Sequence, residues 1–329
     1  MSVAAYDPAP RDFPETARAA AFLALMDSLA CAFRALQDPA CTKLLGALVP
    51  GATMAFGARV PGTSYQLDPV KAAFDVGTMV AWHDANDPAL ATVSGHLSDN
   101  LGAILAVADY RARKAIAEGA SPPTVRDLLA ALLGAHEHAS LEWARLAHAT
   151  GAAPAAQTTQ STDDVASVSA RWALIRISSA AAAAGLLGGT RDQIAAAVAI
   201  ARSEMPATEY PGTATGSDAR ERWRVGDATS RGLRLALIAL AGQEAPRPVS
   251  ARPNDESGLP RVVLEELARD WRVAGAAPDV ESRIRDRFAA SVTAHFPAVQ
   301  AGRIAMMFAD RAKLEALPVN ELVSMTVRN

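Results

Sequence analysis

The chain has 329 residues, half of them hydrophobic and few aromatic, and its 32 Lys and Arg against 35 Asp and Glu leave it nearly neutral. Without a basic patch or arginines interleaved with aromatics, the composition argues against a nucleic-acid-binding protein. Alanine is by far the most common residue, and because alanine loses no side-chain entropy in a helix, the composition favours helices.

The two cysteines, Cys31 and Cys41, are too few for an iron–sulfur cluster, which needs about three or four thiolates. The first residues lack the basic and apolar segments of a secretory leader. No run approaches about 18 apolar residues without a charge, so no membrane span is expected. We therefore expect a cytoplasmic protein with reduced thiols and no membrane partner.

Helices are predicted in the first part of the chain by apolar residues at three- and four-residue spacing. Such a pattern runs from Glu15 to Leu36. An irregular connection with two Pro-Gly turns follows over 39–67. Asp68 then precedes Pro69, which is a strong helix start, and this helix is expected to reach about Asp84.

A loop leads from there to Ser98, which is expected to cap a helix from Asp99 to Glu118. The next helix is expected from Val125 to about His148. The polar stretch at 151–164 reads as an exposed loop.

The helix expected at 165–187 is apolar almost all round, which is typical of a buried helix. Thr190 and Gln193 then form a capping box for a helix at 191–203. Residues 204–222 are expected to be irregular. The remaining helices are expected at 227–241, 260–273, 280–295 and 299–315, with a short last one from about Val319. The five tryptophans are expected to be core or interface aromatics.

We find no convincing strand pair and no internal repeat, so the predicted fold class is all-α. We expect a helical domain over 1–242, a linker over 243–258 and C-terminal helices over 259–329 that pack back on the same domain.

Polar side chains crowd into one short segment between two long apolar helices, at a predicted helix–loop–helix junction. They are Asp84, Asn86, Asp87, His96 and Asp99. A loop held between two helices is a common place for chemistry, and a histidine suits general acid–base catalysis. The alternative is structural: a histidine bonded within a polar loop, and a helix-end aspartate facing solvent.

A metal site is a rival interpretation of this junction, using His83, Asp84, Asp87 and His96. Their spacing matches no strong template for metal ligands, so we expect neither metal nor cofactor. The run His136-Glu137-His138 lacks the i, i+4 histidine pair of a zinc protease helix. We expect it to be a solvated helix face.

Long collinear motifs in the chain resemble the MmgE/PrpD family, and within it the 2-methylcitrate dehydratases. They are PACTKLLGALVPG, GARVPGTSYQLDPVKAAF, GTMVAWHDANDP, GHLSDNLGAILAVADY, RDLLAALLGAHE, GDATSRGLRLAL and PVNEL. The resemblance covers roughly two thirds of the chain. It implies a helical bundle like the large domain of that family, and a homodimer formed through it. The segment around 242–280 is too short for the α+β lid domain that members carry, so the lid is expected to be missing.

The resemblance also implies a chemistry: metal-free elimination of water from a β-hydroxy tricarboxylate. The catalytic aspartate and histidine of the family match Asp84 and His96. The substrate-binding positions implied here are Asn86, Asp87, Ser98, Arg171, Arg220 and Arg222.

Three positions depart from the family pattern. Pro88 stands where a threonine is usual, so a hydroxyl donor is lost. Arg171 stands where members have a histidine, and an arginine binds carboxylates but cannot act as a base. Glu221 stands where members have a substrate-binding lysine, unless a gap places Arg220 or Arg222 there.

Two functions therefore compete. The first is a cofactor-independent hydro-lyase acting on a small polycarboxylate or β-hydroxy acid. The second is a member without a lid, inactive or repurposed, that binds a bulkier ligand or a protein partner.

Overall fold

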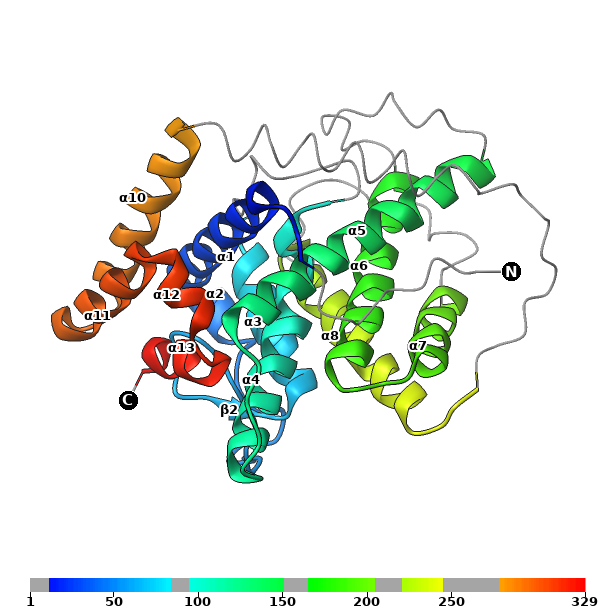
Figure 1. Cartoon of the computed structure of the whole chain (residues 1–329), viewed down its shortest axis with the longest axis horizontal. Helices are drawn as coiled ribbons and strands as arrows, with labels where there is room; N and C mark the ends of the chain where they lie inside the picture. The colour runs from blue at the N-terminus through cyan, green and yellow to red at the C-terminus, as the bar shows by residue number, and fades with distance from the viewer. Residues whose placement is uncertain (1–11, 84–94, 151–164, 205–220, 245–277, 329) are drawn as a thin grey trace.

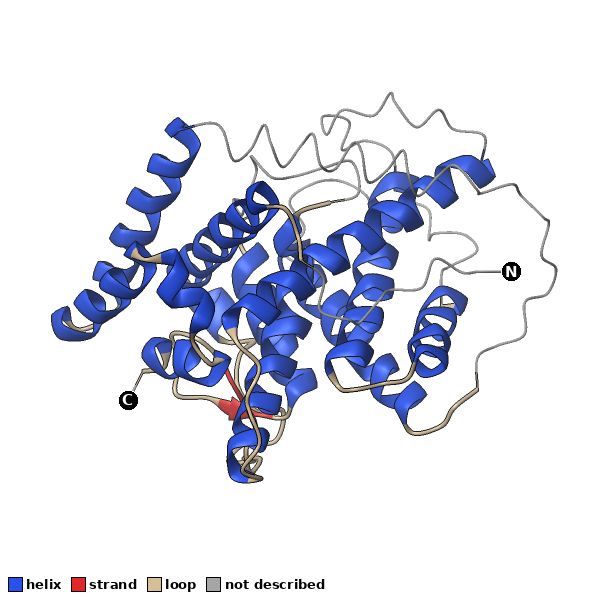
Figure 2. Ribbon diagram, viewed as in Figure 1, coloured by secondary structure: helices blue, strands red, loops and turns tan. Residues whose placement is uncertain are grey.

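The structure is a computed structural model that describes residues 12–83, 95–150, 165–204, 221–244 and 278–328 (Figures 1 and 2). Helices dominate it, which confirms the all-α fold class. The elements are α1 (Glu15–Ala35), α2 (Pro39–Thr42), β1 (Ala58–Arg59), β2 (Gln66–Leu67), α3 (Pro69–Ala81), the 3-10 helix η2 (Leu97–Asn100), α4 (Leu101–Ala117), α5 (Val125–Thr150), α6 (Val165–Leu186), α7 (Arg191–Ser203), α8 (Glu221–Leu240), α10 (Pro278–His295), α11 (Ala298–Ala309), α12 (Arg311–Ala316) and α13 (Val319–Thr326).

The helices form one bundle in which α3 and α4 lie between two flanking groups (Figure 1). On one side α6 and α8 pack on each other, and α7 packs on both. On the other side α10 packs along α1, and α13 packs on α4. Helix α5 contacts both α1 and α6, so it links the two sides. A large apolar core runs through the bundle, and a small separate cluster lies where α3, α6 and α8 meet.

Several helix starts follow the capping rules that the sequence predicts. The Asp68 carboxylate accepts hydrogen bonds from the backbone N–H groups of Val70 and Lys71, with Pro69 as the first helical residue. Thr190 and Gln193 form the predicted capping box at the start of α7. These local signals fix where the helices begin, and burial of their apolar faces then fixes how they pack.

Three glycines bring the backbones of α3, α4 and α8 into close contact. A Cβ atom on Gly226 would meet Thr78 Oγ1 and would lie 2.5 Å from Phe74 O. One on Gly102 would lie 2.5 Å from Ala73 O, and one on Gly77 would lie 2.9 Å from the Cα of Gly226. Real Cβ atoms essentially never come closer than 3.0 Å to such atoms, so only glycine fits at these three positions. We call this contact of α3, α4 and α8 the glycine crossing.

The sequence-based prediction of the elements was wrong at several places in the described part of the chain. Helix α8 begins at Glu221, six residues before the predicted 227, because tight packing on α3 keeps Gly226 helical although glycine disfavours helices. The predicted helix at 299–315 is broken at Asp310. The backbone of Asp310 is extended, so α11 ends there, and the Asp310 side chain caps the start of α12. A two-residue antiparallel pair, β1 and β2, was not predicted. The helix expected at 260–273 lies outside the described residues.

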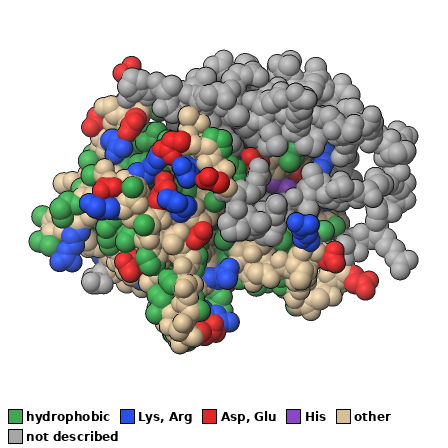
Figure 3. All heavy atoms as spheres, in the orientation of Figure 1, with side chains coloured by type: hydrophobic (Ala, Val, Ile, Leu, Met, Phe, Trp, Pro, Cys, Tyr) green, Lys and Arg blue, Asp and Glu red, His purple; other side chains and the backbone are tan. Residues whose placement is uncertain are grey.

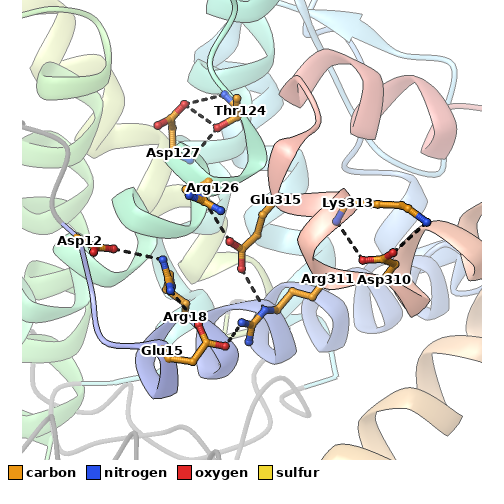
Figure 4. Close-up of polar contacts among 10 residues, drawn as sticks. All are labelled: Asp12, Glu15, Arg18, Thr124, Arg126, Asp127, Asp310, Arg311, Lys313 and Glu315. Carbon is orange, nitrogen blue, oxygen red and sulfur yellow. Dashed lines mark hydrogen bonds and ion pairs between the residues drawn. The ribbon is translucent and has the colours of Figure 1, made fainter.

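Ion pairs tie helix α12, near the C-terminus, to α1 and α5 (Figure 4). Glu315 is only 3% exposed and lies between two arginines, 3.3 Å from Nε of Arg126 and 3.1 Å from Nε of Arg311. Arg311 also pairs with Glu15 on α1. Acidic and basic side chains accordingly alternate over this face (Figure 3). The cavity between Arg18 and Glu315 is about 30 Å³, which is room for a water or two and not for a substrate.

Two features of α1 and α2 bear on the predictions about thiols and membranes. No disulfide joins Cys31 and Cys41, which are both buried, and burial raises the pKa of Cys41 to about 12. Within the described part of the chain, α1 is the one helix long and apolar enough to cross a membrane. Of its most apolar window, 83% is buried inside the protein.

Candidate functional site

The turn before α4 comprises residues 95–99 and is called the His96 turn below. It is held by a glycine and an aspartate. His96 is the N-cap of η2, and the Oδ2 atom of Asp99 accepts a hydrogen bond from the His96 backbone N–H at 3.0 Å. Gly95 has φ +122°, and a Cβ there would lie 2.6 Å from Asp99 Oδ2. A side chain at position 95 would therefore be strained and would also displace the carboxylate. The expectation that Ser98 caps the helix was wrong: His96 is the N-cap of η2, Asn100 is the N-cap of α4, and Ser98 lies inside η2 with 3% of its surface exposed.

Asp99 anchors this turn to α6. Its Oδ1 atom accepts a hydrogen bond from Nη2 of Arg171 at 3.1 Å, and the residue is 2% exposed. Burial alone would raise the pKa of Asp99, but the Arg171 guanidinium and the nearby His96 outweigh it and hold that pKa below its usual range. Both carboxylate oxygens are thus engaged, so Asp99 serves as an ionised anchor and not as a proton acceptor.

Asn100 connects the same turn to α6 and α8. Its side-chain oxygen accepts hydrogen bonds from the hydroxyls of Ser178 at 2.8 Å and Ser179 at 2.7 Å. The Ser179 hydroxyl lies 2.9 Å from that of Thr229, which in turn accepts from the backbone N–H of Ala103 at 3.1 Å. All of these side chains are buried. The network therefore fixes α4, α6 and α8 against one another at the end of η2.

His136 lies under this turn from the side of α5. Its side chain is 1% exposed, and the charges of Asp99 and His96 both act on it. Burial lowers the pKa of His136 to about 4, so it is neutral at physiological pH.

The predicted solvated helix face at His136-Glu137-His138 was therefore wrong. These residues are 1%, 6% and 3% exposed. The polar face of α5 looks exposed in the sequence because its partners are distant in the chain. Glu142, one turn on, is bound by Arg202 of α7, with Nε at 2.9 Å from Oε2.

The two arginines predicted to bind substrate on α6 and α8 face different partners. Arg171 binds Asp99, and its guanidinium lies 5.3 Å from the ring centroid of Trp172. Arg222 lies over the ring of Trp82 at 5.4 Å and 3.9 Å from a carboxylate oxygen of Asp38. The structure thus joins Arg171 to the His96 turn, and it places Arg222 against the C-terminal end of α3.

Arg224 and Trp172 were missed as candidate residues. The Arg224 guanidinium lies 5.9 Å from the ring centroid of Trp172, the same indole that Arg171 contacts. Trp172 also covers the small apolar cluster of Ala81, Ile175, Val225 and Ala228. The only sequence signal was an arginine beside the GDATSR motif, and the predicted helix began only at 227, three residues after Arg224.

The other predicted site residues lie outside the described residues. They are Asp84, Asn86, Asp87 and Arg220, together with the substituted Pro88. Of the rival metal set, only His83 and His96 are described. Among the described residues, no group of three or more His, Cys, Asp or Glu side chains is arranged to hold a metal ion.

Comparison with known proteins shows which family the chain belongs to. The MmgE/PrpD N-terminal domain matches residues 4–267, most of the chain. The chain belongs to the MmgE/PrpD family. The chain is 44% identical over 188 residues to the 2-methylcitrate dehydratase of Cupriavidus necator and 42% identical over 181 residues to that of Salmonella typhimurium. In each case the match covers 55% of this chain and 34% of the relative.

A mitochondrial 2-methylcitrate dehydratase of Yarrowia lipolytica is 38% identical over 184 residues, which are 55% of this chain and 32% of that protein. The chain thus spans about a third of the length of the curated relatives it matches. The family assignment accordingly rests on the helical domain, which carries the His96 turn and the glycine crossing.

Proposed function

We propose that this chain is a cofactor-independent lyase, a hydro-lyase similar to 2-methylcitrate dehydratase, acting on a small polycarboxylate or β-hydroxy acid. The observation that carries the proposal is the His96 turn. Its backbone is fixed by Asp99, its neighbours are tied to α6 and α8, and the His96 side chain stays partly exposed. A histidine held in this way, in a family whose matched relatives are named dehydratases, suits proton transfer to a bound ligand.

The elimination needs a base that takes the proton from the carbon next to a carboxylate. It also needs an acid that protonates the hydroxyl as the C–O bond breaks, so that water leaves and a C=C bond forms. In the proposal Asp84 and His96 share these two transfers. Asn86, Asp87, Ser98, Arg171, Arg220 and Arg222 contact the substrate, and the guanidinium groups oppose the charge of its carboxylates.

A second candidate is a family member without the lid that is inactive or repurposed to bind a bulkier ligand or a protein partner. The observation that favours it is the ion pair of Arg171 with Asp99. Arg171 stands where the family resemblance places a histidine, and its guanidinium is bound to the buried Asp99. A base is therefore replaced by a cation that already has a carboxylate partner.

The test is turnover of 2-methylcitrate and of citrate by the purified chain, followed by the ultraviolet absorbance of the new double bond. The proposal predicts turnover that His96→Gln abolishes and Lys114→Gln leaves intact, because Lys114 pairs only with the exposed Glu118. Absence of turnover, with ligand affinities that His96→Gln does not change, would refute the lyase. Absence of turnover with an affinity that depends on His96 would favour the second candidate.

We also propose that the chain is cytoplasmic and forms a homodimer through its helical domain. Large apolar side chains on its surface support the dimer: Leu48 is 82% exposed and Val49 67% exposed. Light scattering at micromolar concentration tests this, and a monomer would refute it.

A further inference from the structure

Four side chains of alternating charge form a ring between α1 and α12, and one side of this ring is open (Figure 4). We call Glu15, Arg18, Arg311 and Glu315 the ion-pair ring. The Glu15 carboxylate lies 2.9 Å from Nη2 of Arg18 and also pairs with Arg311. Arg311 in turn places its Nε atom 3.1 Å from Oε1 of Glu315. No ion pair or hydrogen bond within the described residues joins Glu315 back to Arg18, so the fourth side has no direct contact.

The open side carries two buried polar atoms without a hydrogen-bond partner among the described residues: Nε of Arg18 and Oε1 of Glu315. Both terminal nitrogens of Arg18 are engaged, one by Asp12 at 3.2 Å and one by Glu15 at 2.9 Å, whereas its Nε–H group is not. Arg311 lies near Oε1 of Glu315, but its N–H group does not have the geometry of a hydrogen bond. A buried donor and a buried acceptor are both costly when they stay unpaired.

Arg18 and Glu315 line the same cavity, whose volume is about 30 Å³. An ordered water needs about 10–15 Å³ of such space and at least two polar partners, so the cavity has room for one or two waters. The remaining wall is partly apolar and partly charged, and it consists of Asp12, Phe13, Arg126, Leu129 and Ala130. The cavity therefore offers one unpaired donor and one unpaired acceptor in a space of the size of a water.

The charges around the cavity favour a neutral occupant. An anion there would lie against the carboxylate of Glu315, and a cation would lie against the guanidinium groups of Arg18 and Arg126. A water both donates and accepts, so it matches the two unpaired atoms without adding charge. The pKa of Arg18 is raised, first by its hydrogen bond to Glu15 and further by the charge of Glu315. Arg18 and Glu315 are therefore near each other although they make no direct contact.

We propose that an ordered water in this cavity accepts a hydrogen bond from Nε of Arg18 and donates one to Oε1 of Glu315. The water closes the ion-pair ring. Because α1 is the first helix of the described chain and α12 is near its end, the water joins the two terminal parts of the bundle. This site is independent of the proposed lyase activity.

The first experiment is a crystal structure of the full-length chain at a resolution that shows ordered waters. One water is expected within about 3.2 Å of both Nε of Arg18 and Oε1 of Glu315. Crystals soaked in bromide separate a water from an anion, because bromide is located by its anomalous scattering. Bromide in the cavity, a direct hydrogen bond between Arg18 and Glu315, or no density between these two atoms would overturn the proposal.

A double-mutant cycle then measures the coupling that the water provides. Arg18→Gln, Glu315→Gln and the double variant are compared by urea denaturation. A water-bridged contact between two charged groups should make their effects non-additive by about 5- to 20-fold in the equilibrium constant for unfolding. The control cycle combines Arg18→Gln with Asp310→Asn, which removes the same charge from the N-cap of α12. Asp310 lies 3.0 Å from Nζ of Lys313 and does not line the cavity.

Additive effects in the first cycle, or equal coupling in both cycles, would contradict the water bridge. If the double variant does not fold, Arg18→Lys replaces Arg18→Gln in both cycles. Lysine keeps the positive charge towards Glu15 but has no Nε–H donor, so the same coupling to Glu315 is expected, and its absence overturns the proposal.

Discussion

Replacing Gly226 with alanine tests whether the crossing of α3, α4 and α8 is held by backbone contact. The new Cβ would lie 2.5 Å from Phe74 O and 2.8 Å from the backbone nitrogen of Thr78, so α8 and α3 must separate by about 1 Å to reach ordinary contact. Overpacking of this kind costs about 1–3 kcal/mol. The same shift loosens the hydrogen bond from Ala103 N–H to Thr229, worth about 1 kcal/mol.

Alanine also gains about 1 kcal/mol of helix propensity over glycine. The expected net loss is therefore about 1–3 kcal/mol in the free energy of unfolding. Urea denaturation followed by circular dichroism measures it. Gly302→Ala is the matched control: Gly302 is exposed in the interior of α11, and a Cβ there meets nothing within 4 Å. That variant should gain up to about 1 kcal/mol, and the reasoning fails if Gly226→Ala is stabilised likewise.

Two further predictions concern buried ionisable groups. Glu315→Gln removes a carboxylate held between two arginines and should lower the free energy of unfolding by about 1–3 kcal/mol. The change should be under about 0.5 kcal/mol for Glu118→Gln, whose ion pair is exposed, and equal losses would contradict the assignment. His136 and His138 have pKa values lowered by burial to about 4, so the unfolded chain, titrating near 6.5, binds more protons in acid. Their contribution is complete above pH 6.5 and is lost as the pH falls towards 4, by about 2–3 kcal/mol each at pH 4.5. Asp75, with a pKa raised by burial to about 6, offsets part of this loss below pH 6. Urea midpoints at pH 7, 5.5 and 4.5 measure the slope, which His138→Gln should reduce; an unchanged slope would show that His138 is not buried neutral.

Helix existence could be predicted well from the sequence because the signals are local. The caps at Asp68 and Thr190 act within one turn, and their side-chain hydrogen bonds are the ones predicted. The start of α8 could not be predicted in this way. Gly226 and the polar residues before it disfavour a helix locally, and only packing against α3, distant in sequence, keeps them helical.

The candidate site shows the same difference between local signals, which the sequence contains, and contacts between distant residues, which it does not. The sequence picked out His96, Arg171 and Arg222 as residue types suited to the chemistry. It could not show that Arg171 belongs with Asp99 and Trp172, while Arg222 belongs with Trp82. These pairings arise from helices brought together only in the folded chain.

The glycine crossing also bears on how motifs in this family should be interpreted. Nearly every base change in a glycine codon that alters the residue introduces a Cβ atom, and at Gly77, Gly102 and Gly226 that atom collides with backbone or with a buried threonine. Such a chain has a less stable bundle whether or not it still turns over a substrate. Selection for a folded protein alone would then retain the segments GTMVAW, NLGAIL and GDATSR. Their presence in a sequence shows that the helical scaffold has been kept. Enzymatic activity has to be judged at positions such as His96 and Arg171, which take no part in the crossing.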